Sequence, residues 1–147
     1  MDIIRLREQL KHDEGCKFSI YKDQFGYPTF GIGHLIIQSD PEYGQPTGTL
    51  ITEDRVNEAF EYDIQRTISD TKVLFPTLDN MPEDAQQVLV NMCYNVGKPR
   101  LSKFVHFIEF INEGNFYSAS YEMLNSAWAK QVPNRANRLS LMLRNIV

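Results

Sequence analysis

Three polar side chains close together in the N-terminal part of the sequence have types that could carry out chemistry. Glu14 and Asp23 are carboxylic acids, and Thr29 supplies a hydroxyl group. Hydrolysis of a glycosidic bond needs a protonated acid at the leaving oxygen and an ionised carboxylate that stabilises charge or directs a nucleophile. Glu14 has Cys16 and Phe18 nearby in sequence, so partial burial would favour its protonated form. It is therefore the candidate acid.

Asp23 and Thr29 suit the other half of such a reaction. Asp23 lies beside Lys22 in a polar turn and is expected to stay ionised. The Thr29 hydroxyl could hold a water beside Asp23, as a single displacement with inversion requires. However, an acid at a helix end and an acid in a turn are common on protein surfaces. The aromatic residues of this stretch, which could stack on sugars, are more often core: Tyr21, Tyr27 and Phe30.

The elements that must position these residues follow from the surrounding pattern. Residues 2–13 carry apolar side chains at helical spacing, with Asp2 as N-cap and Gly15 as the stop. This predicts a helix that ends at Glu14. Residues 18–32 are rich in aromatic and β-branched residues and are predicted to form a β-hairpin. Gly26 suits its reversal, so Asp23 and Thr29 can face the same space.

The rest of the chain is predicted to be mainly helical. Residues 38–49 form a turn-rich loop that could contain or lead into a third strand, and Thr52 is the predicted N-cap of a long helix over 53–69. Further helices are expected to start near four positions, and two glycines to close helices. These residues are Pro82, Ser102, Asn115 and Pro133 for the starts, and Gly97 and Gly114 for the ends.

The expected fold class is therefore α+β, mainly α, as one domain over residues 1–147. A small N-terminal lobe with a three-stranded antiparallel sheet is expected over about 14–52. The helix 53–69 connects it to a helical lobe made of 1–13 and 70–147.

Composition and charge exclude several classes of protein. Hydrophobic residues make up 42% and charged residues 23%, which is ordinary globular usage. The net charge is −4, with 8 Lys/Arg against 16 Asp/Glu in residues 1–97 and 7 against 3 in 98–147. This balance argues against a general nucleic-acid binder but permits an anionic polymer along one face.

The N-terminus and the cysteines indicate the cellular setting. Charged residues interrupt the first apolar segment too often for a signal peptide or a membrane span. We expect a monomer that is made in the cytoplasm without a signal peptide and without stable membrane insertion. Cys16 and Cys93 are expected to be reduced, and no spacing resembles a zinc site. No metal and no cofactor are predicted.

The stretch E-G-x4-I-Y-x-D-x2-G-Y-x-T-x-G-I-G-H, from Glu14 to His34, resembles the active-site signature of phage-type lysozymes, glycoside hydrolase family 24. The match fixes about a dozen positions together and spans nearly the whole chain. It continues at Ile51, Thr52, Asp63, Asn91, Met92, Gly97, Phe104, Trp128, Arg138 and the segment 133–136.

This resemblance implies a lysozyme-like fold and an enzyme that cuts the β-1,4 bond between N-acetylmuramic acid and N-acetylglucosamine in bacterial peptidoglycan. Glu14 would be the general acid, Asp23 the carboxylate that serves the water or the developing cation, and Thr29 the residue that positions the water. The implied sugar contacts are Gly31, Gly33, Leu35, Tyr94 and Asn95. The protein would act on the cell wall, reached through the periplasm in the case of a phage endolysin.

Four further residues are implied to support the structure. In the family, the counterpart of His34 forms an ion pair with an acid on the long helix. The resemblance therefore implies that His34 pairs with Asp63 and does not act as a catalytic base. Trp128 and Arg135 would hold the C-terminal lobe and the floor of the cleft together. The chain departs from the family at Asn95, where a glutamine is common.

A second departure is Phe107, at a cleft-edge position that is often small and polar. Two alternatives stay open at this point. One is a non-catalytic relative that binds peptidoglycan or a partner protein, and the other is a glycosidase that cleaves chitin.

Overall fold

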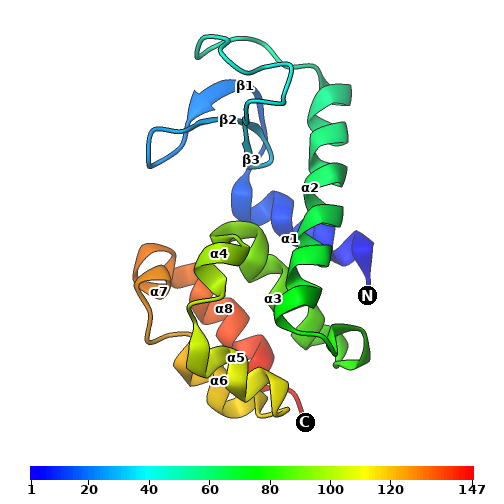
Figure 1. Cartoon of the computed structure of the whole chain (residues 1–147), viewed down its shortest axis with the longest axis vertical. Helices are drawn as coiled ribbons and strands as arrows, with labels where there is room; N and C mark the ends of the chain where they lie inside the picture. The colour runs from blue at the N-terminus through cyan, green and yellow to red at the C-terminus, as the bar shows by residue number, and fades with distance from the viewer. The chain divides into compact units, whose positions relative to one another are not determined.

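The computed structural model of the protein describes residues 1–147. The chain divides into two compact units, Arg7–Gln65 and Met1–Leu6 with Arg66–Val147. The boundaries between the units fall inside two helices, α1 (Ile3–Glu14) and α2 (Glu53–Leu74), which Figure 1 labels. The structure confirms an α+β fold that is mainly helical with a small antiparallel sheet near the N-terminus.

The unit Arg7–Gln65 contains the sheet. Its strands are β1 (Lys17–Lys22), β2 (Pro28–Gly31) and β3 (His34–Leu35), in the antiparallel order β1-β2-β3. The third strand lies ahead of the loop 38–49, which the sequence suggested could contain or lead into it. Gly31 and Gly33 both have positive φ, and this lets the chain reverse at once after β2. Hydrophobic side chains buried in this unit are Leu10, Ile20, Phe30, Ile32, Ile36, Ile51, Val56, Ala59, Phe60 and Ile64.

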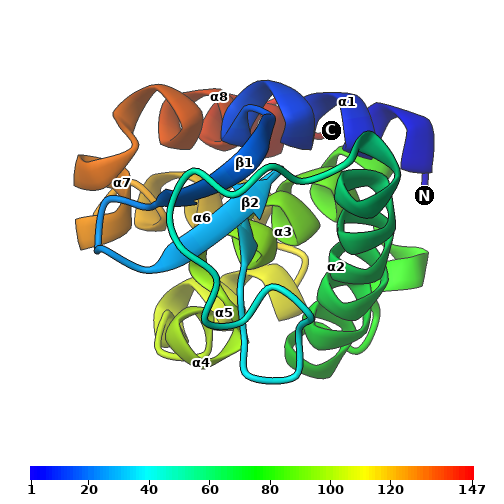
Figure 2. The same cartoon turned by 90° about the horizontal axis from the view of Figure 1, so that it is seen from above.

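A loop over residues 36–52 connects β3 to α2 through a series of turns. Figure 2 shows this cyan to green segment passing around the sheet before it enters α2. It adds only an isolated bridge between Ser19 and Leu50 to the sheet. The Thr52 hydroxyl accepts a hydrogen bond from the Arg55 N–H at 3.2 Å, which confirms it as the cap of α2. The helix runs five residues further than predicted, to Leu74.

The second unit is built from helices after α2. They are η1 (Leu78–Asn80), α3 (Glu83–Val96), α4 (Lys98–Leu101), α5 (Val105–Asn112), α6 (Phe116–Glu122), α7 (Ala127–Gln131) and α8 (Pro133–Arg144). α3, α6 and α7 all contact α8, and α5 contacts α6. The short helices α4 and α7 were not predicted, and the helix expected near Ser102 begins at Val105.

Two other helix starts are capped by side chains, at Asp2, which was predicted as an N-cap, and at Asn115, which was predicted as a helix start. The Asp2 carboxylate accepts the Arg5 N–H at 3.0 Å, and the Asn115 side chain accepts the Ser118 N–H at 3.1 Å. Cys16 is exposed, Cys93 is buried, and both are free thiols. Among the helices, none combines the length and the apolar character needed to span a bilayer.

Candidate active site

Glu14 is the last residue of α1, and its carboxylate lies directly against Gly33. A β-carbon placed on Gly33 would come within 2.9 Å of Oε2 of Glu14 and 3.3 Å of its carboxyl carbon. Gly33 also has a φ of +66°, which side chains rarely allow. The glycine therefore lets the turn between β2 and β3 approach the candidate acid closely. Glu14 itself is partly exposed.

Asp23 follows β1 directly and organises the hairpin turn. Its Oδ1 accepts the backbone N–H groups of Phe25 and Tyr27, both at 2.9 Å. Its own N–H donates to the Tyr27 carbonyl, and its carbonyl accepts the Gly26 N–H. These bonds fix the orientation of the carboxylate through one oxygen and leave Oδ2 for a substrate or a water.

Thr29 lies in the middle strand and is buried, with 4% of its surface exposed. It is paired with Tyr21 of β1 on one side and with Leu35 of β3 on the other. Its hydroxyl donates to the Tyr27 carbonyl at 3.0 Å. Because that bond uses the hydroxyl hydrogen, the oxygen can accept a hydrogen from a water.

Tyr21 is close enough to both candidate acids to be affected by their charges. It is half-buried, and burial raises the pKa of its phenol, which the negative charges of Glu14 and Asp23 raise further. The Lys17 ammonium lies 4.2 Å from the centre of its ring. Both candidate carboxylates thus act on one phenol that keeps its proton. The sequence suggested for Tyr21 either a place in the core or stacking on a sugar, and it gave no sign that both acids act on its phenol.

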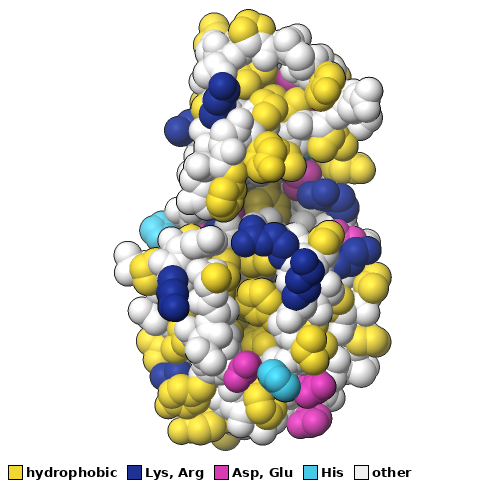
Figure 3. All heavy atoms as spheres, turned by 60° about the vertical axis from the view of Figure 1, so that its left-hand side comes forward, with side chains coloured by type: hydrophobic (Ala, Val, Ile, Leu, Met, Phe, Trp, Pro, Cys, Tyr) yellow, Lys and Arg dark blue, Asp and Glu magenta, His cyan; other side chains and the backbone are white.

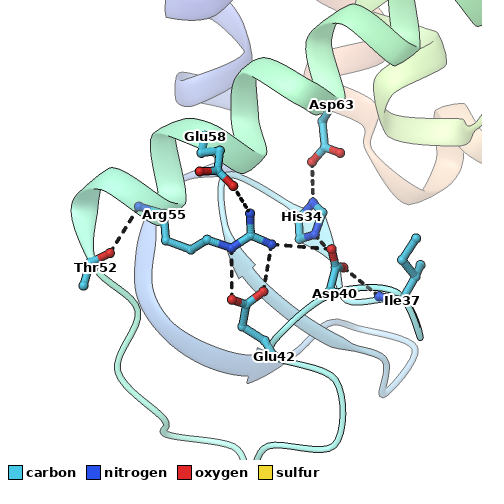
Figure 4. Close-up of polar contacts among 8 residues, drawn as sticks. All are labelled: His34, Ile37, Asp40, Glu42, Thr52, Arg55, Glu58 and Asp63. Atoms are coloured by element: carbon cyan, nitrogen blue, oxygen red, sulfur yellow. Dashed lines mark hydrogen bonds and ion pairs between the residues drawn. The ribbon is translucent and has the colours of Figure 1, made fainter.

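His34 pairs with Asp63, as the resemblance implied. Nδ1 of His34 lies 2.7 Å from Oδ2 of Asp63, and both side chains are buried. The second ring nitrogen, Nε2, lies 2.9 Å from Oδ2 of Asp40, a partner that the sequence did not reveal (Figure 4). His34 therefore has a structural environment, and its ring nitrogens are engaged by carboxylates.

The remaining candidates of this unit differ in their surroundings. Leu35 is 47% exposed and available to a ligand. Gly31 is buried, and a β-carbon on it would meet the Val56 side chain at 3.1 Å, so the space beside it is filled by α2. Its predicted contact with sugar stays a prediction. Figure 3 shows hydrophobic side chains at the surface in the upper part of the view. The exposed hydrophobic residues of this unit include Phe25, Tyr27, Leu35, Ile37 and Leu50.

The other predicted residues lie in the second unit, where their side chains support one another. Asn95 Oδ1 accepts the indole N–H of Trp128 at 2.7 Å, so Asn95 also has a structural contact that the sequence did not suggest. Tyr94, beside it, is partly exposed. Trp128 itself is buried, with 4% of its surface exposed.

Two more residues of this unit are buried. Arg135 donates from Nε to Oδ1 of Asn91 at 2.8 Å. Phe107 has 1% of its surface exposed and packs edge-to-face on Phe75. Its size therefore serves the helical core.

Comparison with known proteins agrees with this geometry. The family described as Phage lysozyme matches residues 11–144, which include both acids and Thr29. The protein named Probable T4-type lysozyme 2 of Dictyostelium discoideum is 30% identical, over 91% of this chain and 90% of that protein.

Two phage proteins match as parts of longer chains. The Pre-baseplate central spike protein Gp5 of Enterobacteria phage T4 is 28% identical over 94% of this chain and 27% of its own length. The Peptidoglycan hydrolase gp36 of Pseudomonas phage phiKMV is 25% identical over 92% of this chain and 14% of its own length. Since the family match covers most of the sequence, the chain belongs to the phage lysozyme family and is a glycoside hydrolase of the lysozyme type.

Proposed function

We propose that this enzyme hydrolyses the β-1,4 bond between N-acetylmuramic acid and N-acetylglucosamine in bacterial peptidoglycan, with inversion at the anomeric carbon. The observation that carries the proposal is that Glu14, at the end of α1, lies in the same compact unit as Asp23 and Thr29 of the hairpin, with the turn at Gly33 next to its carboxylate. The family match and the name of the phiKMV relative, a peptidoglycan hydrolase, support the choice of polymer.

In the proposed reaction Glu14 donates its proton to the glycosidic oxygen as the C–O bond breaks. The sugar that leaves departs as an alcohol, and positive charge develops on the ring that stays. Gly33 lets the turn of the sheet approach Glu14 closely, since a β-carbon there would meet its carboxylate. Placing a proton donor correctly contributes roughly 10² to 10⁴ in rate.

A water attacks the same carbon from the opposite face. Asp23 Oδ2 accepts one of its hydrogens and Thr29 accepts the other, since the Thr29 hydrogen is already given to the Tyr27 carbonyl. Asp23 takes up the proton as the new C–O bond forms, so the proton lost by Glu14 is balanced. Burial and the charges of both acids raise the pKa of Tyr21, so its phenol keeps its proton and adds no negative charge near them.

The setting follows from the polymer. We propose that the enzyme acts on the bacterial cell wall, where peptidoglycan lies, and that it does so as a monomer, because every residue assigned to the reaction belongs to a single chain.

The test is the clearing of a peptidoglycan suspension by the wild type and by Glu14→Gln. The variant keeps the size of the side chain but removes the acid, and we expect activity to fall by roughly 10² to 10⁴. Glu8→Gln is the matched control, because Glu8 is an exposed acid on the same helix, and it should clear like the wild type.

Three outcomes would contradict the proposal. The first is equal clearing by Glu14→Gln and the wild type. The second is an inactive wild type that still binds the polymer, which would favour a non-catalytic relative. The third is faster release of reducing ends from chitin than from peptidoglycan, which would move the substrate to chitin.

A further inference from the structure

The second partner of His34 belongs to a charged cluster that the reaction does not use directly. We call it the Asp40 cluster: His34, Asp40, Glu42, Arg55 and Asp63. Asp40 and Glu42 come from the loop 36–52, Arg55 and Asp63 come from α2, and His34 begins β3. Figure 4 shows the side chains converging between the loop and the helix.

Arg55 holds the loop side of this cluster. Its Nε and Nη2 donate to the two oxygens of Glu42, both at 2.9 Å, and Nη2 also lies 3.5 Å from Oδ1 of Asp40. Glu42 is 7% exposed, so this bidentate pair is shielded from water. The guanidinium also lies over the Phe30 ring, at 5.5 Å from its centre.

Asp40 is thereby fixed in one orientation. Its Oδ2 accepts the Ile37 N–H at 2.9 Å and also faces Nε2 of His34. The tether to Arg55 and the bond to the loop backbone leave the carboxylate little freedom. Asp40 therefore forms a rigid contact on the side of the imidazole opposite Asp63.

An imidazole with a carboxylate on each ring nitrogen must donate from both, and only the charged ring has two N–H groups. Burial alone lowers the pKa of His34, but the hydrogen bonds and charges of Asp63 and Asp40 together raise it above its ordinary value.

The charges around the ring agree with that state. Asp63 and Arg55 face the cluster from α2, Asp40 and Glu42 face it from the loop, and β2 contributes the neutral Phe30 ring. Glu58 reaches Arg55 only from an exposed position on α2. The three acids of the cluster outnumber Arg55 and favour a positive imidazole.

The cluster lies next to the candidate acid along the backbone. His34 directly follows Gly33, where the space that a β-carbon would fill is taken by the Glu14 carboxylate. His34 is also paired with Phe30 across the sheet, and their rings lie 4.8 Å apart. The residue that carries the imidazole is thus joined to Gly33, the neighbour of Glu14, through a single peptide unit.

We propose that Asp40 is a positioning residue for the reaction: it holds the His34 ring from the side opposite Asp63 and so keeps Gly33 against the carboxylate of Glu14. This inference rests on the proposed role of Glu14 as the acid. It predicts that the enzyme works only while His34 is charged, and that activity is lost as pH rises and the imidazole gives up its proton.

The first test is Asp40→Asn, measured as kcat and KM on soluble peptidoglycan fragments over a range of pH. We expect kcat to fall roughly tenfold with little change in KM, because misplacing a catalytic group slows the chemical step. The alkaline limb of the pH profile should move to lower pH, since His34 loses one of its two carboxylates. The matched control is Glu58→Gln, which contacts Arg55 from an exposed position and should leave both quantities unchanged.

The second test needs no variant. Titration of the three histidine rings by NMR in the wild-type protein should show His34 charged throughout the pH range of activity, with activity lost in step with its deprotonation. Activity that persists after His34 becomes neutral would overturn the proposal, as would an Asp40→Asn enzyme with the wild-type kcat and alkaline limb. An active wild type with either result contradicts only the role of Asp40, whereas an inactive wild type contradicts the proposed function as well.

Discussion

Tyr21 lies where both candidate acids act on it, and its protonation state matters to each of them. Its pKa is raised by burial and by the charges of Glu14 and Asp23, so the phenol stays neutral at the pH where carboxylates are ionised. A neutral O–H group can donate to one carboxylate without adding a third negative charge. We therefore expect Tyr21 to support the reaction as a neutral polar group near both acids.

Replacing Tyr21 with phenylalanine should lower kcat by roughly tenfold, equivalent to about 1.4 kcal/mol of transition-state stabilisation. The ring and its contact with Lys17 remain, so stability should change little. Steady-state kinetics on soluble peptidoglycan fragments measure the effect. Tyr62→Phe, at an exposed tyrosine of α2, is the control. Unchanged kcat in Tyr21→Phe would remove Tyr21 from the account.

The contact between Gly33 and Glu14 gives a second prediction at this scale. Gly33→Ala places a β-carbon 2.9 Å from Oε2 of Glu14, so the acid must move and activity should fall by at least tenfold. Gly44→Ala is the matched control, since Gly44 also has a positive φ, +84°, but nothing lies within 4 Å of an added β-carbon. Both variants should lose about 1 kcal/mol of stability. Clearing assays and urea unfolding separate the two effects, and equal activity of the two variants would contradict the contact.

At the scale of elements, the hairpin between β1 and β2 is held by the same residue that is proposed to serve the water. Asp23 Oδ1 accepts two backbone N–H groups of the turn, and a turn without that acceptor would leave them to solvent. The side chain therefore has one structural and one chemical oxygen.

Two substitutions of Asp23 should separate these roles. Asp23→Asn keeps an oxygen that can accept both N–H groups, so it should unfold close to the wild type yet lose activity. Asp23→Ala should lose activity and about 1 to 2 kcal/mol of stability. Thermal or urea unfolding of both variants, with clearing assays, provides the measurement. If the alanine variant is as stable as the asparagine variant, the turn does not depend on this carboxylate.

The elements also show what the sequence could and could not predict. Local signals gave the caps Asp2 and Thr52 and the helix start at Asn115, because a capping side chain bonds only a few residues along the chain. The third strand was not located from the sequence because two residues of β3 carry little periodic signal and the turn depends on Gly31 and Gly33.

The site was predictable where a motif fixed it and not where partners are distant in sequence. The signature gave Glu14, Asp23 and Thr29 together as candidates, and it implied the pairing of His34 with Asp63 that the structure contains. The contact of Asp40 with His34 and the bidentate pair of Arg55 with Glu42 depend on how the loop 36–52 folds back. The spacing of residues in the sequence does not predict how this loop folds.

At the scale of the whole molecule, the uneven distribution of charge affects the electrostatic attraction between the enzyme and peptidoglycan. The net charge is −4, and the positive excess is confined to residues 98–147. A negatively charged protein has no long-range attraction to an anionic wall, and short-range contacts must then supply the binding.

The rate of peptidoglycan clearing should therefore depend only weakly on salt. We expect a change of less than about threefold between 20 and 150 mM NaCl, values chosen so that the Debye length falls from roughly 20 Å to 8 Å. Initial rates at constant pH provide the measurement. A steep loss of activity across this range would show that the basic part of the chain drives binding electrostatically.

The most direct test of the central claim, that Glu14 and Asp23 act from opposite faces of one glycosidic linkage with a water between Asp23 and the sugar, is the configuration of the first product. Proton NMR of a soluble peptidoglycan fragment, recorded before the sugar ring mutarotates, shows which anomer forms first. The account predicts the α-anomer from the β-1,4 bond, because one displacement inverts the carbon. Initial formation of the β-anomer would contradict it, since retention requires two displacements and a different role for Asp23.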